Sequence, residues 1–225
     1  WLRVLVILTL IPYHTALTFT GLGMTYIFQP VSNITILPLL AFTASLDNFF
    51  MTLLFFLSGI GTYYALQRRS IAQYCSERIR KLFVPLIAGL VTICPAQAYT
   101  KALYHGYQGN LFSFLKEFFS RKVAYYLGYA HLWFLLYLFV FSMLCIPLFK
   151  KLKDGNNLKK TALFLSEGKN ILIPFLFVML AELFLRPFFP GTLNLVSDWA
   201  NFIVYLSVFI FGFIFAYDGG IQEKF

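Results

Sequence analysis

The sequence predicts an all-α integral membrane protein, a bundle of about six transmembrane helices. Of its 225 residues, 60% are hydrophobic and only 12% are charged, whereas a soluble domain is about 45–50% apolar and about 25% charged. Too few polar residues remain to cover a surface in water, so the expected solvent is lipid. The same composition argues against a disordered chain, a coiled coil and a tail that binds nucleic acid.

Six apolar segments have about the 20 residues that a helix needs to cross a bilayer. In chain order they are residues 2–19, 46–66, 82–99, 132–149, 171–189 and 200–217. Residues 21–44 are semi-polar and contain Pro30 and Pro38, so we expect a long loop there that dips toward the membrane. The chain opens on Trp1 without a Met and closes at Phe225 soon after an apolar segment. We interpret it as a single transmembrane domain, residues 1–225, that is incomplete at both ends.

The orientation follows from the 18 Lys and Arg residues, which outnumber 9 acidic residues and give a net charge of +9. Most of them lie in two loops, residues 67–81 and 150–169, and basic loops stay on the cytoplasmic side. We therefore expect a multi-pass protein of the plasma (inner) membrane with a cytoplasmic N-terminus. Most of the positive charge then sets topology and does not by itself indicate an acidic partner.

The loop between the third and fourth segments contains a predicted amphipathic helix, residues 111–127. Apolar residues recur there at helical spacing, opposite Lys116, Glu117 and Arg121. We expect this helix to lie in the outer interface. It either rests on the lipid or presents an acceptor substrate.

The first segment contains two ionisable residues, Arg3 and His14, and such groups are costly inside a span and therefore candidates for function. At about 100° and 1.5 Å per residue, their spacing leaves them within about 20° of one face and about 16 Å apart along the axis. Pro12 tends to kink the helix beside the histidine. The alternative interpretation is that Arg3 anchors the helix at the interface and that His14 is a hydrogen-bonded packing residue.

Two further groups of residues each allow two interpretations. Arg78, Arg80 and Lys81 close the first basic loop. They either contact anionic lipid headgroups and set topology, or bind the phosphates of a cytoplasmic cofactor. His131 and Trp133 begin the fourth segment from the outer side, where such residues commonly anchor a span at the interface.

Glu182 and Arg186 are four residues apart at the outer end of the fifth segment, a spacing that predicts a structural ion pair on one helix. The three cysteines have the spacing of neither a disulfide framework nor a zinc site. We therefore expect no bound metal.

Several motifs resemble, in the same order, those of the acyltransferase-3 family, the multi-span membrane O-acyltransferases. They are Arg-x10-His at Arg3 and His14, FFLSG at 55–59, RIRKLFVPL at 78–86, HLWFL at 131–135, and a glycine-containing apolar segment at 211–218 that ends on an acid. The basic loop and HLWFL look most like the glucan-modifying, succinyl-transferring branch. The sequence departs from the family where Lys81 replaces the second Arg of Arg-x-x-Arg, and it has six predicted spans where the family has about ten.

The resemblance implies that His14 is the base or proton relay for an acceptor hydroxyl and that Arg3 orients a cytoplasmic acyl-CoA. The donor would be acetyl-CoA or succinyl-CoA. The acceptor would be a carbohydrate or glycolipid of the cell envelope, modified by O-acetylation or a related transfer in contact with membrane lipids. Ser58 is a candidate for stabilising the oxyanion, and His131 and Trp133 are further site candidates.

A multi-span transporter or flippase for an anionic or lipid-linked substrate is the alternative, because an intramembrane histidine and proline-bearing spans suit it as well. Transporters often contain repeated halves, and no repeat is visible in this sequence. A membrane scaffold without chemistry would leave the shared face of Arg3 and His14 unexplained. Of the three functions, the sequence therefore favours the acyltransferase.

Overall fold

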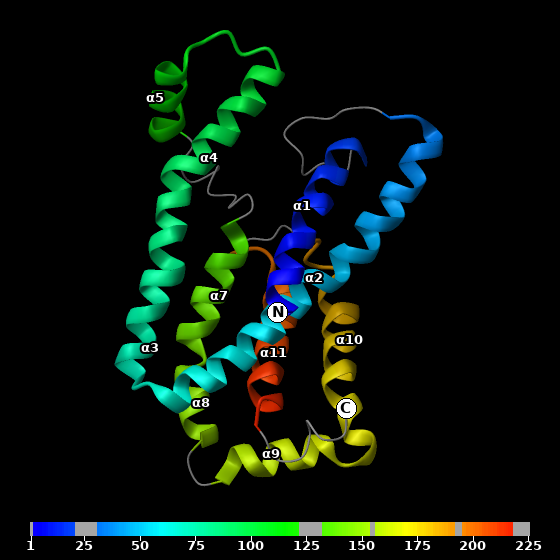
Figure 1. Cartoon of the computed structure of the whole chain (residues 1–225), viewed down its shortest axis with the longest axis vertical. Helices are drawn as coiled ribbons and strands as arrows, with labels where there is room; N and C mark the ends of the chain where they lie inside the picture. Colours follow the sequence, from blue (N-terminus) through cyan, green and yellow to red (C-terminus); the bar gives the residue numbers. More distant parts are fainter. Residues whose placement is uncertain (1, 21–30, 122–131, 154–155, 192–194, 218–225) are drawn as a thin grey trace. The chain divides into compact units, whose positions relative to one another are not determined.

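The computed structural model of the chain describes residues 2–20, 31–121, 132–153, 156–191 and 195–217. Within these ranges all regular structure is helical and no strand occurs (Figure 1), which confirms the predicted all-α class. The chain divides into two compact units, and we describe each by itself. The first comprises Trp1–Leu54 and Ile87–Ala130, and the second comprises Phe55–Leu86 and His131–Phe225.

Three helical stretches within the described residues are long and apolar enough to cross a membrane: Ile34–Arg68, Ile71–Tyr104 and Gly168–Leu185. A fourth is added if α7 (Trp133–Leu144) and α8 (Ile146–Lys153), which meet at a 46° bend, form one broken span. Two shorter apolar helices are α1 (Leu2–Thr20) and α11 (Trp199–Phe215). Each of the six predicted segments overlaps one of these helices or the bent pair. The length and apolar character of these helices identify a membrane protein.

Helix α2 (Asn33–Arg68) corrects the predicted loop, because residues 33–44 are helical. The loop was predicted from the semi-polar residues of this segment and from Pro30 and Pro38, and Pro38 lies inside the helix. A proline removes one backbone hydrogen bond, and helices in apolar surroundings tolerate that loss when neighbouring groups satisfy the freed carbonyl. The remaining part of the predicted loop, residues 21–30, lies outside the described residues.

The basic segment 67–81 is also helical where a loop was predicted. After Arg68 the chain turns within two residues and α3 (Ile71–Arg78) begins at a capping box, in which the Ser70 hydroxyl and the Gln73 side chain each bond the other's backbone N–H. A π-helical turn, η1 (Ile79–Phe83), follows and leads into α4 (Val84–Tyr104). Pro85 offers no N–H at this point, which weakens the regular α pattern.

The first unit contains α1, the first part of α2, most of α4, and α5 (Leu111–Arg121). The predicted amphipathic helix is thus confirmed as far as Arg121, and residues 122–127 lie outside the described residues. Phe114 and Phe118 of α5 are buried against Ala98 of α4. The inner part of its apolar face is therefore covered by protein rather than lipid, while Phe119 stays exposed.

The second unit has an aromatic core around Phe55, which is fully buried and contacts the rings of Trp133, Phe141 and Tyr205. Helices α2 and α11 approach closely because each offers a glycine to the other. A Cβ atom on Gly59 would collide with the carbonyl oxygen of Phe209, and one on Gly212 would collide with that of Phe56. These glycines allow the two backbones to pack without an intervening side chain.

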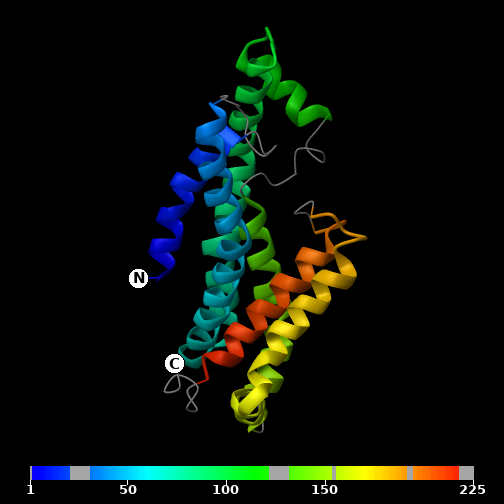
Figure 2. The same ribbon diagram turned by 90° about the vertical axis from the view of Figure 1, so that its right-hand side faces the viewer.

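The remaining helices of the second unit are α10 (Ile173–Leu185), which runs beside α11 (Figures 1 and 2), and α9 (Asn157–Ser166). Helix α9 contacts α8, α11 and the short 3-10 turn η4 (Gly168–Leu172), and it runs across the lower ends of α8 and α11 in Figure 1. It buries Leu158 and Ala162 on one side.

Candidate functional site

His14 lies in the middle of α1 and is half-buried. Its Nδ1 is 2.8 Å from the carbonyl oxygen of Leu10, one turn earlier on the same helix. A carbonyl can only accept, so Nδ1 carries the hydrogen in the neutral ring and Nε2 is the acceptor nitrogen. The helix backbone thus sets the tautomer that a general base acting through Nε2 requires.

Asp47 of α2 is linked to α1 at Tyr13, the residue before His14. Asp47 was not among the residues predicted for the site. The buried Tyr13 donates its hydroxyl hydrogen to Oδ1 of Asp47 at 2.7 Å. The Tyr13 ring also meets His14 edge-on, with ring centroids 5.1 Å apart, and meets Phe50 of α2 in the same manner. A signal was available, because Asp47 falls inside the predicted segment 46–66, where an ionisable residue is a candidate for function.

Arg3 lies in the first turn of the same helix. Helix α1 is continuous through Pro12, so the backbones at positions 3 and 14 are separated by about three turns, or about 16 Å. The side chain of Arg3 lies outside the part of the chain that the structure describes. Arg3 and His14 therefore lie on one helix, and their shared face stays a prediction.

Arg78 is half-buried and points into the protein, whereas Arg80 and Lys81 of the same basic cluster are exposed. Its Nη2 donates to the hydroxyl of Thr62 at 3.1 Å, and its guanidinium carbon is 4.7 Å from the centre of the Tyr74 ring. Thr62 and Tyr74 are both buried, and their hydroxyl oxygens are 3.2 Å apart. These contacts join α3 to α2, a structural role that the sequence did not indicate.

Arg80 and Lys81 are exposed on η1. The ammonium of Lys81 is 3.2 Å from Glu77, whose carboxylate also binds Arg69 at 2.9 Å. None of the ion pairs found among the described residues includes Arg80. Arg80, with Lys81 beside it, is therefore the part of this cluster that presents positive charge to an anionic ligand.

The other predicted site residues have mixed positions. Ser58 is half-buried in α2, and its carbonyl accepts the Thr62 hydroxyl at 2.9 Å, so it lies one turn from the partner of Arg78. Trp133 is 7% exposed and packs in the aromatic core. The ring therefore packs against protein, and its role as an interfacial anchor stays a prediction. His131 lies outside the described residues.

The predicted ion pair at the end of α10 is confirmed. Arg186 makes two hydrogen bonds to Glu182, at 2.6 and 2.7 Å, and a third at 2.8 Å to Oδ1 of Asn201. The hydrogen bond to Glu182 raises the pKa of Arg186, which keeps the guanidinium charged. The buried Asp198 in turn accepts from the backbone and side chain of Asn201, so this network joins α10 to the start of α11.

No group of three or more His, Cys, Asp or Glu side chains is placed to hold a metal ion within the described ranges. The residues suited to a phosphorylated cofactor are the exposed cations of η1. His14 belongs to the first unit, whereas Ser58, Trp133 and the basic cluster belong to the second. The arrangement thus offers a fixed imidazole on one helix and a cationic turn on another.

One of the three comparisons with known proteins gave a match. A family model of the acyltransferase-3 type, described as an acyltransferase domain, matches residues 1–224. Neither the curated proteins nor the solved structures gave a match to this chain.

Proposed function

The chain belongs to the acyltransferase-3 family and is a membrane acyltransferase, and from this premise we propose its donor and acceptor. It transfers an acetyl or succinyl group from a cytoplasmic acyl-CoA to a hydroxyl of an envelope carbohydrate or glycolipid. Its place is the plasma (inner) membrane, with the N-terminus in the cytoplasm. The basic residues of η1, α8 and α9 support that orientation, because lysine and arginine stay on the cytoplasmic side.

The single observation that carries the proposal is the geometry of His14. With Nδ1 bonded to the Leu10 carbonyl at 2.8 Å, Nε2 is the nitrogen that can take a proton from an acceptor hydroxyl. The hydroxyl oxygen then attacks the thioester carbonyl, the new C–O bond forms and the C–S bond breaks. The proton passes from Nε2 to the departing CoA thiolate, which leaves His14 neutral for the next cycle.

The donor contacts divide among the basic residues according to their surroundings. Arg78 contributes mainly to packing, through Thr62 and Tyr74. The exposed Arg80 and Lys81 are the better partners for the phosphates of CoA, Arg80 through paired hydrogen bonds and Lys81 as a point charge. Arg3, about three turns before His14 on α1, orients the acyl arm.

The proposal is tested by donor binding followed by transfer. The melting temperature of the purified full-length protein is measured with acetyl-CoA, with succinyl-CoA and with no addition. A ligand at about 100 times its Kd stabilises a protein by about 2.7 kcal/mol, so the true donor is expected to produce the larger shift. The same protein in proteoliposomes should then move the labelled acyl group to a carbohydrate hydroxyl.

The expected result is a clear shift with one acyl-CoA and labelled ester on the carbohydrate. If neither acyl-CoA changes the melting temperature and no labelled ester forms, the proposed donor is wrong. A protein that carries labelled carbohydrate across the membrane without any acyl-CoA would contradict the proposal in favour of transport.

A further inference from the structure

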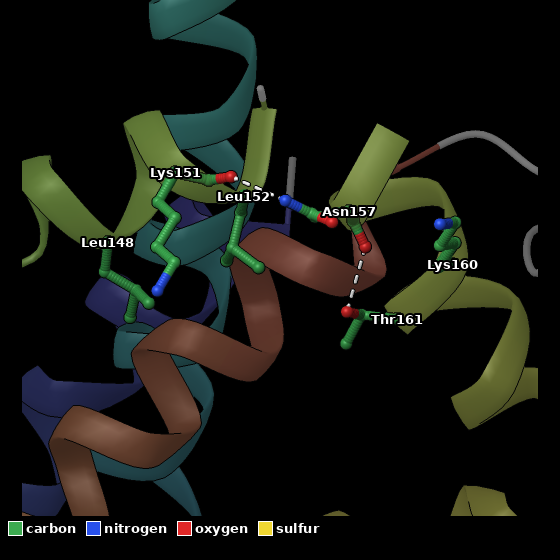
Figure 3. Close-up of a pocket in the computed structure, with 6 residues that line it drawn as sticks. All are labelled: Leu148, Lys151, Leu152, Asn157, Lys160 and Thr161. Atoms are coloured by element: carbon green, nitrogen blue, oxygen red, sulfur yellow. Dashed lines mark hydrogen bonds between the residues drawn. The ribbon is translucent and has the colours of Figure 1, made fainter. Parts of the chain in front are cut away.

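A pocket of about 370 Å³ lies between α8 and α9 in the second unit, and none of its lining residues belongs to the site described above (Figure 3). Two lysines, an asparagine, a threonine and two leucines line it: Leu148, Lys151, Leu152, Asn157, Lys160 and Thr161. Both lysines are exposed, and in the view of Figure 3 they lie on either side of Asn157 and Thr161. None of the lining residues is acidic, so the pocket favours an anion.

Hydrogen bonds fix the wall of this pocket. Asn157 donates its side-chain N–H to the carbonyl oxygen of Lys151 at 3.3 Å, which ties α9 to α8. The Thr161 hydroxyl donates to the carbonyl oxygen of Asn157 at 2.9 Å. Both bonds engage backbone acceptors, and the two lysine ammonium groups remain the strongest donors in the lining.

Of the neighbouring lysines, Lys153 has a hydrogen-bond partner within the chain. Lys153 donates to the carbonyl oxygen of Leu66 at 2.9 Å and so caps the last turn of α2. Among the described residues, no ion pair includes Lys151 or Lys160. Their positive charge is therefore not neutralised by a carboxylate of the described chain.

The first turn of α9 gives a second reason to expect an anion in this pocket. Its first turn contains Lys159 and Lys160 but no acidic residue, and Asn156 makes no side-chain cap. The N-terminus of a helix carries partial positive charge, so cations there are unfavourable unless an anion is near. An anion in the pocket would relieve this unfavourable arrangement.

The location of the pocket distinguishes a lipid phosphate from a soluble one. Helix α8 ends a candidate broken span, and α9 is followed by the candidate span Gly168–Leu185, which begins with η4. The pocket thus lies at the ends of two candidate spans, where we expect lipid headgroups. Leu148 and Leu152 line it beside the lysines, and Leu148 is 39% exposed, which suits the glycerol and first methylenes of a lipid.

We propose that this pocket binds the phosphodiester headgroup of an anionic phospholipid, with Lys151 and Lys160 contacting the phosphate oxygens. Basic pockets between helices on the cytoplasmic side of membrane proteins bind headgroups in this way. The site shares no residue with the acyl-transfer proposal and does not depend on it. Its ligand contributes charge neutralisation between α8 and α9.

The test uses the full-length protein in nanodiscs of phosphatidylcholine with or without phosphatidylglycerol. The melting temperature and the binding of phosphatidylglycerol by native mass spectrometry are measured for wild type, Lys151→Gln, Lys160→Gln and the double variant. Lys159→Gln is the matched control, because Lys159 is the adjacent residue of α9 and does not line the pocket. Further arms add inorganic phosphate or CoA to phosphatidylcholine nanodiscs.

Phosphatidylglycerol should raise the melting temperature of the wild type, and the Lys159→Gln control should keep this shift. Each lining variant should bind the lipid about fivefold more weakly, the equivalent of about 1 kcal/mol per lysine near a headgroup. The proposal is overturned if the wild type shows no dependence on phosphatidylglycerol, or if the control loses the shift as fully as the double variant. A shift reproduced by phosphate or CoA without phosphatidylglycerol, and lost in the double variant, would overturn the lipid assignment.

Discussion

Tyr13 of α1 donates a hydrogen bond of 2.7 Å to Asp47 of α2. Tyr13 is the residue immediately before His14 in the chain. The position of the imidazole therefore depends on α2 as well as on its own helix. The Tyr13 ring also contacts the edge of the His14 ring. With His14 as the base of the proposed transfer, we expect Tyr13 and Asp47 to act as positioning residues.

Replacing Tyr13→Phe keeps the ring and removes the hydroxyl that binds Asp47. A hydrogen bond to a charged group is worth about 1.5–3 kcal/mol, and a loss of about 1.4 kcal/mol from the transition state is tenfold in rate. We expect turnover to fall about tenfold with little change in donor affinity. Tyr64→Phe, on a ring that is 46% exposed, is the control and should behave as wild type; equal turnover in both variants would contradict this role.

Arg78 and Arg80 should respond differently to the same substitution. Arg78→Gln removes the hydrogen bond to Thr62 and the contact with Tyr74, at a cost of about 1–2 kcal/mol in stability. Arg80→Gln should leave the melting temperature unchanged and weaken acyl-CoA binding about fivefold, because one charge pair in water contributes about 1 kcal/mol. Thermal unfolding and donor titration of both variants check this, and the reverse assignment of effects would be inconsistent with the contacts of Arg78.

Gly59→Ala should destabilise the second unit, because the added Cβ meets the carbonyl oxygen of Phe209. Overpacking of this kind costs about 1–3 kcal/mol, and here the obstacle is backbone rather than a side chain that can rotate. Gly61→Ala is the matched control, since two residues along a helix turn the substitution by about 200°. The melting temperature of Gly59→Ala should be well below that of Gly61→Ala. Equal melting temperatures would contradict the close approach of α2 and α11 at Gly59.

The network at the start of α11 contains a buried carboxylate, Asp198, and a part-exposed one, Glu182. We expect the two to contribute differently to the free energy of unfolding. Asp198 is 1% exposed and accepts from both the backbone and the side chain of Asn201, so Asp198→Ala should cost about 1–2 kcal/mol, as for a lost helix cap. The carboxylate of Glu182 is 39% exposed, and solvent screening keeps the effect of Glu182→Gln below about 1 kcal/mol. If Glu182→Gln lowered the melting temperature more, the ion pair would matter more than the cap.

The sequence predicted the helices well where apolar content decides the structure. The first segment, 2–19, is α1 almost to the residue, because a mainly apolar segment in lipid must satisfy its backbone hydrogen bonds internally, as a helix does. Residues 33–44 are helical, although a loop was predicted there because residues 21–44 are semi-polar and contain Pro30 and Pro38. The capping box at Ser70 and Gln73 was readable as a helix start, and the emphasis on charge in that segment obscured it.

Side-chain partners across helices were the part that the sequence did not reveal. The inward turn of Arg78 depends on where Thr62 lies after the chain reverses between α2 and α3, and spacing along the chain does not determine this. The Glu182–Arg186 pair was predictable because both ends lie on one helix, whereas Asn201, its third member, comes from another. Local geometry was therefore predictable, and contacts between helices required the structure.

The most direct test of the account is acyl transfer by the full-length His14→Ala protein, measured in a single turnover with labelled acyl-CoA alongside donor binding. His105→Ala, an exposed histidine in the first unit, is the control for loss of an imidazole. The account predicts a rate reduced about 100-fold or more, because a general base contributes about 10²–10⁴-fold, with donor affinity and melting temperature unchanged. A folded His14→Ala protein that binds the donor and transfers the acyl group at the wild-type rate would contradict it.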